Sequence, residues 1–213
     1  MNRNVYSLVL ADDVIKAVDR RAYELGTSRS NLINQILAEA LDCVTPEMRM
    51  RDIFSTVCSL ADSCFQIQQQ RSDSLLTLRT ALEYKYRPTI NYKLELARSP
   101  NEFLGSIKVH IRTQSQQLIN LFNSFFVWRI KLESDKLAGL GYNNYECCLT
   151  SGCFTRRLFN TFSGDDDAAE AISGYIANLD NSLKAFFASP AMFRASAAEA
   201  EKDYSEILKK HII

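Results

Sequence analysis

The first apolar positions of the chain recur at every second residue, which is the period of a β-strand. Within residues 5–10 the large side chains on one face are Tyr6, Leu8 and Leu10. One strand of six residues needs a partner, and no second strand pattern follows nearby in this part of the chain. The same strand of a second copy is then the available partner. The pattern therefore predicts dimerisation through residues 5–10.

Apolar positions next recur at helical spacing in two short runs. The first run opens at Asp12 and Asp13, whose carboxylates suit the positive end of a helix, and it stops at Gly26, which favours a left-handed cap. The second follows the hydroxyls at 27–30 and continues to Leu41. Two short amphipathic helices and one strand hold too little core for a monomer, so a dimer is again predicted.

From the boundary at Thr45 and Pro46 onward, the sequence favours helices. They are expected at about 47–82, from the turn at 99–101 to about 137, and at about 149–162, 166–188 and 190–211. The stretch 84–96 is ambiguous, because its alternation suits a strand while Pro88 also permits a break between helices. The expected fold class is mainly α. A dimerising, DNA-binding domain at 1–45 would precede an all-helical bundle at 46–213.

Composition narrows the class of protein. With 213 residues and 46% hydrophobic content, the chain can bury a substantial core. No apolar run is long enough to span a bilayer, and the N-terminus is too short and too quickly acidic for a signal peptide. The expected protein is cytoplasmic with no membrane partner. Six cysteines without a CxxC pair, beside two histidines, predict reduced thiols, no metal and no cofactor.

The net charge of the chain is zero, but the charged residues are distributed unevenly along it. Residues 46–131 carry twelve Lys and Arg against seven Asp and Glu, whereas residues 132–213 carry eight against twelve. A neutral total does not favour DNA binding, since phosphate neutralisation normally supplies much of that affinity. The basic middle segment suits either added phosphate contacts or an ordinary solvated helix surface. Its basic residues include Arg49, Arg51, Arg71, Arg79, Lys85, Arg87, Lys93, Arg98, Lys108 and Arg112.

Catalytic patterns are missing from the sequence. His110 has no sequence partner that would make it a general base, and the run Asp165 to Asp167 is more typical of a helix start than of a cation site. The aromatic residues between 122 and 128 fit a bundle core. An enzyme is therefore not expected.

The segment from Arg3 to Leu41 resembles the ribbon-helix-helix family of bacterial, plasmid and phage DNA-binding proteins. The resemblance lies in the alternating strand, the helix ending at Leu25-Gly26 and the second helix opening at 27–30. It implies that outward side chains of a two-stranded ribbon meet base edges in the major groove. Here these are Arg3, Val5, Ser7 and Val9. Because Val5 and Val9 are apolar where the family more often has polar or basic residues, a module that only dimerises or binds another protein stays open.

The start of the second helix is a candidate phosphate anchor, because its free N–H groups and dipole attract anions. Its residues are Thr27, Ser28, Arg29 and Ser30. The expected function is a homodimeric or higher-order regulator of transcription that binds double-stranded DNA, with 46–213 serving oligomerisation, an effector or a protein partner. The alternative is a plasmid or phage accessory protein (relaxosome, partition or antitoxin-like) that uses the same module for assembly.

Overall fold

The N-terminal part of the computed structural model is a helical hairpin, and the model describes residues 7–61, 63–68, 74–190 and 193–213. Helix α1 (Asp12–Leu25) ends at Gly26, whose φ of 62° is left-handed, and α2 (Arg29–Ala40) begins after Ser28. Ser28 Oγ accepts a hydrogen bond from the Asn31 amide at 3.2 Å. Local capping thus places both helices where the sequence predicts them.

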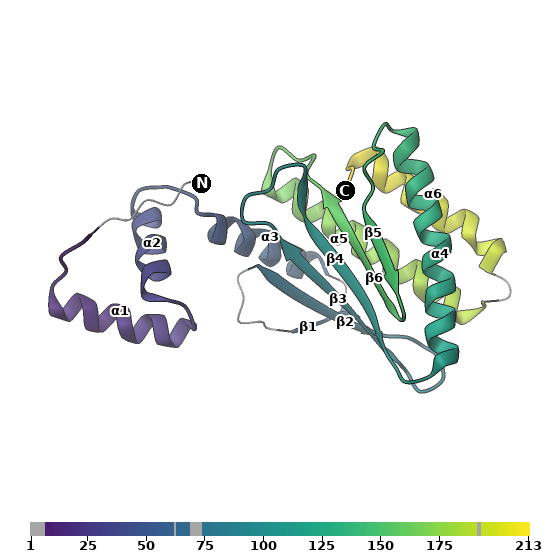
Figure 1. Cartoon of the computed structure of the whole chain (residues 1–213), viewed down its shortest axis with the longest axis horizontal. Coiled ribbons are helices and arrows are strands. Elements are labelled where there is room, and N and C mark those ends of the chain that lie inside the picture. The colour runs from purple at the N-terminus through teal and green to yellow at the C-terminus, as the bar shows by residue number, and fades with distance from the viewer. Residues whose placement is uncertain (1–6, 62, 69–73, 191–192) are drawn as a thin grey trace.

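The hairpin has a small core of its own. Val18 and Ala22 of α1 pack with Leu32 of α2, and Ile33 covers their edge. Figure 1 shows α1 and α2 set apart from the sheet, with α3 between them and the rest of the molecule. So small an apolar core supplies little burial energy, so the hairpin by itself is a weakly stabilised unit.

The rest of the chain is built on one antiparallel sheet. Helix α3 (Pro46–Leu60) leads into it, with Thr45 Oγ1 accepting from the Met48 amide at 3.1 Å. The six strands lie in the order β1-β2-β3-β4-β6-β5, and every neighbouring pair is antiparallel. Their bounds are β1 (Gln66–Gln68), β2 (Leu75–Ala81), β3 (Thr89–Leu96), β4 (Phe103–Arg112), β5 (Cys147–Thr150) and β6 (Cys153–Phe159).

Four helices pack on one face of this sheet (Figure 1). Besides α3 they are α4 (Gln116–Gly139), α5 (Asp165–Ala188) and α6 (Phe193–Lys210). The ring of Phe154 on β6 stacks on Phe126 of α4, with centroids 4.4 Å apart. Tyr92 of β3 donates a hydrogen bond to Asp180 of α5 at 2.9 Å. No described helix or strand covers the other face of the sheet. That face is therefore open in the described part of the chain.

The sheet overturns the predicted fold class. The protein is α+β with a six-stranded antiparallel sheet, and the expectation of a mainly α protein with an N-terminal ribbon-helix-helix and an all-helical remainder is wrong. The helix expected at 47–82 ends at Leu60, and the one expected at 149–162 is the β5–β6 hairpin. In the single chain, residues 7–11 form no strand, and the rest of the predicted strand lies outside the described residues.

The physical reason is visible in β4, which the sequence analysis assigned to a helix. Ile107, Val109 and Ile111 are buried, while the residues between them are exposed. This is period-two burial of a half-covered sheet. Gly105 lies at a register shift near the start of the same strand, and a Cβ there would overlap the carbonyl oxygen of Glu95. Only glycine fits this close approach of β3 and β4.

A buried ionic cluster joins helices α4 and α5 to the sheet. Arg129 and Glu133 on α4 and Arg156 on β6 are all fully buried. Arg129 Nε donates to Glu133 Oε1 at 2.6 Å, and Arg156 Nη1 lies 3.0 Å from Glu133 Oε2. The hydroxyls of Tyr175 and Tyr145 also donate to this carboxylate, each at 2.9 Å. Because its three charged side chains are not exposed to solvent, the cluster orients the helices against the sheet.

Candidate nucleic-acid interface

The residues predicted to touch base edges lie at the N-terminal end, before α1. Arg3 and Val5 fall outside the described residues. Ser7 and Val9 are exposed and belong to neither helix nor strand. Both described side chains are therefore accessible to a macromolecule.

The residues predicted to anchor phosphate surround the start of α2. Ser28 caps the helix, Ser30 is exposed, and Thr27 is half-buried. Arg29 is exposed, but its Nη2 donates to Asp19 Oδ2 on α1 at 2.7 Å. The structure thus brings these four residues together around one accessible helix N-terminus, with the guanidinium held by a carboxylate of the neighbouring helix.

Apolar side chains also cover outer surfaces of the hairpin. They are exposed on both helices and on the segments that flank them, in a region whose buried core holds three residues. The exposed set is Leu8, Val9, Val14, Ile15, Leu25, Ile36, Leu37, Leu41 and Val44. A concentration of exposed aliphatic residues on so small a unit marks an interaction surface.

The open face of the sheet forms a second, polar surface that the sequence analysis missed. Strands β1, β2, β3 and β4 line a groove of about 370 Å³. Its lining residues are Gln68, Thr77, Arg79, Asn91, Lys93, Lys108 and His110. We call it the basic groove. The alternation of Lys108, His110 and Arg112 with buried aliphatic residues is the sequence signal that would have placed these side chains on one face.

His110 lies within this groove beside two lysines. Partial burial lowers the pKa of its imidazole, and the positive charges of Lys108 and Lys93 lower it further. Lys108 lies on the same face of β4 as His110. Lys93 on β3 is the cross-strand partner of Lys108. The groove therefore favours an uncharged His110 as long as no anion offsets the two lysines.

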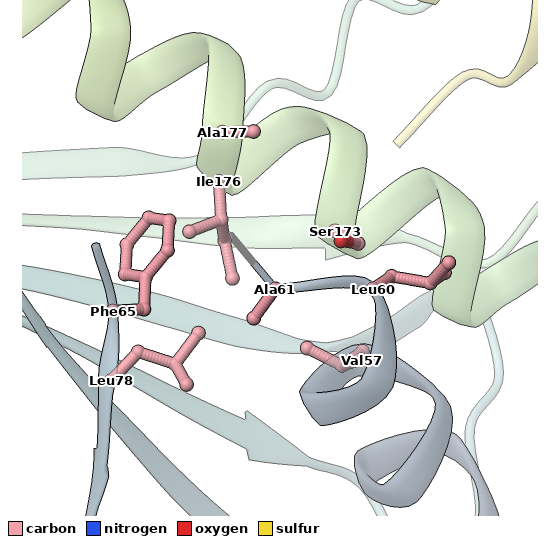
Figure 2. Close-up of a pocket in the computed structure, with 8 residues that line it drawn as sticks. All are labelled: Val57, Leu60, Ala61, Phe65, Leu78, Ser173, Ile176 and Ala177. Atoms are coloured by element: carbon pink, nitrogen blue, oxygen red, sulfur yellow. The ribbon is translucent and has the colours of Figure 1, made fainter. Parts of the chain in front are cut away.

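An apolar notch lies on the other face, between α3, β2 and α5. Figure 2 shows Val57, Leu78 and Ile176 converging on it from these three elements. The notch holds about 10 Å³, which is close to the space of a single water molecule. It is a packing defect of the core and too small for a ligand.

The residues that the structure describes contain neither a membrane-spanning helix nor a cluster of metal ligands. None of their helices is long and apolar enough to cross a bilayer. Among the same residues, no group of three or more His, Cys, Asp or Glu side chains is placed to hold a metal ion. All six cysteines are free thiols.

Comparison with known proteins returned no matching family model, no matching curated protein and no matching solved structure. The functional assignment therefore rests on the residues and geometry described above.

Proposed function

We propose that this chain is a dimeric DNA-binding protein that regulates transcription. The observation that carries the proposal is the N-terminal hairpin, whose apolar core cluster holds three residues while apolar side chains are exposed on both of its helices. A second copy packed on this surface would supply the missing core, as closed symmetric dimers commonly do. The partner in the proposal is thus another copy of the same hairpin.

DNA contact follows from what surrounds that apolar surface. In a symmetric pair, the N-terminal segments of two copies enter the major groove together, where Ser7 can donate to or accept from a base edge. The start of α2 in each copy then faces the backbone, and Arg29 and Ser30 bind phosphate oxygens. Base contacts supply specificity and phosphate contacts supply register.

In this proposal, the domain at 46–213 binds an effector or a protein partner. Its folded core is separate from that of the hairpin. The DNA bound would be that of a bacterial cell, plasmid or phage, and the site of action cytoplasmic. The alternative is that the same hairpin assembles a larger nucleoprotein complex. The experiment must distinguish this role from transcriptional regulation.

The test is selection of duplexes from a random library by the full-length protein, followed by fluorescence anisotropy on a selected site and on a scrambled one. A regulator enriches one sequence family and binds it at least roughly a thousandfold more tightly than the scrambled duplex. Enrichment of no sequence, with equal affinity for both duplexes, would overturn the regulatory proposal in favour of an assembly role.

A matched pair of serine variants locates the contact. Ser7→Ala should reduce discrimination between the two duplexes while leaving most nonspecific affinity. Ser134→Ala removes an exposed serine from α4 and should change neither value. Equal effects of the two variants would remove the N-terminal segment from the DNA interface.

A further inference from the structure

The basic groove places two like charges directly opposite each other. Lys93 on β3 and Lys108 on β4 are cross-strand partners, and both side chains are exposed on the open face. Like charges in this position destabilise a sheet. Within the described part of the chain, neither lysine forms an ion pair, and Glu95, two residues further along β3 on the same face, pairs with neither. The pair therefore has no counter-ion among the residues that the structure describes.

The neighbouring row of side chains completes the cationic surface. Arg79, Asn91 and His110 are aligned across β2, β3 and β4. Arg79 Nε donates to Asn91 Oδ1 at 2.9 Å, which holds the guanidinium above the sheet. Its two terminal nitrogens keep the planar fork that matches phosphate oxygens. An oriented arginine therefore lies one row from two lysines that form no ion pair with any described residue.

The size and lining of the groove indicate a compact anion. Its volume of about 370 Å³ lies within the range of small-molecule sites. Among the described residues, no phenylalanine, tyrosine or tryptophan lines it, so it lacks the large aromatic platform on which sheets bind single-stranded nucleic acids. The domain as a whole is close to neutral, with twenty Lys and Arg against nineteen Asp and Glu over 46–213. Such a domain attracts a long polyanion weakly, whereas a local cluster binds a short one.

We propose that the basic groove binds a small metabolite carrying two or more linked phosphate groups. Lys93 and Lys108 contact one phosphate as point charges, and Arg79 binds the next through its terminal nitrogens. Gln68 and Asn91 are the neutral polar groups that lie beside the ligand. Binding neutralises the repulsion between the lysines, so the ligand stabilises the sheet that holds it. This inference concerns the sheet alone and does not rest on DNA binding by the hairpin.

Calorimetric titration of the full-length protein with inorganic tripolyphosphate, pyrophosphate and monophosphate at matched ionic strength tests the proposal. Affinity should rise with the number of linked phosphates. Lys108→Gln and Lys93→Gln should each weaken tripolyphosphate binding by roughly tenfold or more, as expected for loss of a charge-assisted contact. Lys131→Gln, an exposed lysine on α4, is the matched control and should bind as the unmodified protein does.

Thermal unfolding shows whether a lysine variant that fails to bind tripolyphosphate is still folded. Because each lysine-to-glutamine change relieves like-charge repulsion, the ligand-free variants should melt at or above the temperature of the unmodified protein. They should also lose the melting shift that tripolyphosphate produces. A variant that binds tripolyphosphate normally, or an unmodified protein that does not bind it, overturns the proposal.

Titration with a short DNA duplex distinguishes a small-ligand site from a nucleic-acid surface on this face of the sheet. If the duplex binds the groove and Lys108→Gln and Lys93→Gln weaken the duplex while tripolyphosphate shows no binding, the face is a nucleic-acid surface and the small-ligand proposal is wrong. Hairpin variants such as Ser7→Ala leave tripolyphosphate binding unchanged, so failure of the groove proposal and failure of the DNA-binding proposal give different results.

Discussion

Arg29, the first residue of α2, donates a hydrogen bond to Asp19 of α1 at 2.7 Å, and so one of the proposed phosphate contacts is already occupied by a carboxylate. The Arg29 and Asp19 side chains are 69% and 35% exposed, so the pair adds little to the stability of the hairpin. A phosphate and Asp19 compete for the same guanidinium. In the proposed DNA complex, this carboxylate would therefore lower the affinity for DNA, while contributing little to the stability of the fold.

Removing that competition gives the first prediction. Asp19→Asn should increase affinity for all duplexes, because it frees Arg29 and removes a negative charge from the interface. Arg29→Ala should decrease affinity evenly and reduce the slope of log affinity against log salt by about one. Fluorescence anisotropy at several salt concentrations measures both effects.

Arg21→Ala is the matched control for Arg29, since Arg21 is an exposed arginine on α1 that pairs with Glu24. It should leave the salt slope unchanged. If Asp19→Asn and Arg29→Ala weakened binding equally, the pair would be a structural link of the hairpin and Arg29 would not contact phosphate.

The second prediction concerns assembly through the hairpin. Ile36 on α2 is 48% exposed in the single chain, so a charge there is tolerated by the monomer but is unfavourable inside a dimer interface. Ile36→Asp should raise the dimer dissociation constant by roughly tenfold or more. Light scattering over a concentration series gives this constant.

Val127→Asp is the matched control, because Val127 is exposed to 62% on α4, far along the chain from the hairpin. It should leave the dissociation constant unchanged. A dimer that tolerates Ile36→Asp but is lost with Val127→Asp would move the interface from the hairpin to the helical layer.

The third prediction follows from the buried cluster around Glu133. Burial by itself would raise the pKa of this carboxyl, but the guanidinium groups of Arg156 and Arg129 outweigh burial and lower it from its ordinary value of 4.5. A carboxyl whose folded pKa is lowered contributes stability at pH values above the unfolded pKa. That contribution is lost as pH falls from 4.5 through the lower, folded pKa.

Glu133→Gln should therefore destabilise the protein by about 3–5 kcal/mol at neutral pH, because it leaves two buried guanidinium groups without their carboxylate. It should also flatten the loss of stability below pH 4.5. Urea unfolding at several pH values measures both. Asp135→Asn, an exposed carboxylate on the same helix, is the control and should preserve stability. Unchanged acid sensitivity in Glu133→Gln would assign that sensitivity to other groups.

The hairpin shows what local sequence can predict. Gly26 and Ser28 specify where α1 ends and α2 begins through contacts within a few residues, so the sequence suffices to place both helices. The helix from 165 to 188 is similarly local, opening with three adjacent aspartates. Residues Thr27 to Ser30 share one helix start for the same reason.

The sheet shows what local sequence leaves open. The run from Ile90 to Leu96 alternates as a strand, but the same residues next to Pro88 also permit a helix break, and only pairing with β2 and β4 decides between them. Cys153 to Phe159 was expected to be helical, yet it pairs with β4 across more than forty residues of sequence. Strand partners are chosen by non-local packing, which a single chain's periodicity does not encode.

The hairpin surface and the basic groove differ in the same respect, namely in how much of each the local sequence specifies. The sequence by itself determined the helical hairpin and its caps, because each cap is a contact between near neighbours in the chain. Only the tertiary structure decided that Lys93 and Lys108 lie opposite each other, because their pairing depends on the register of two strands, and that register is fixed by which faces of β3 and β4 the helices bury.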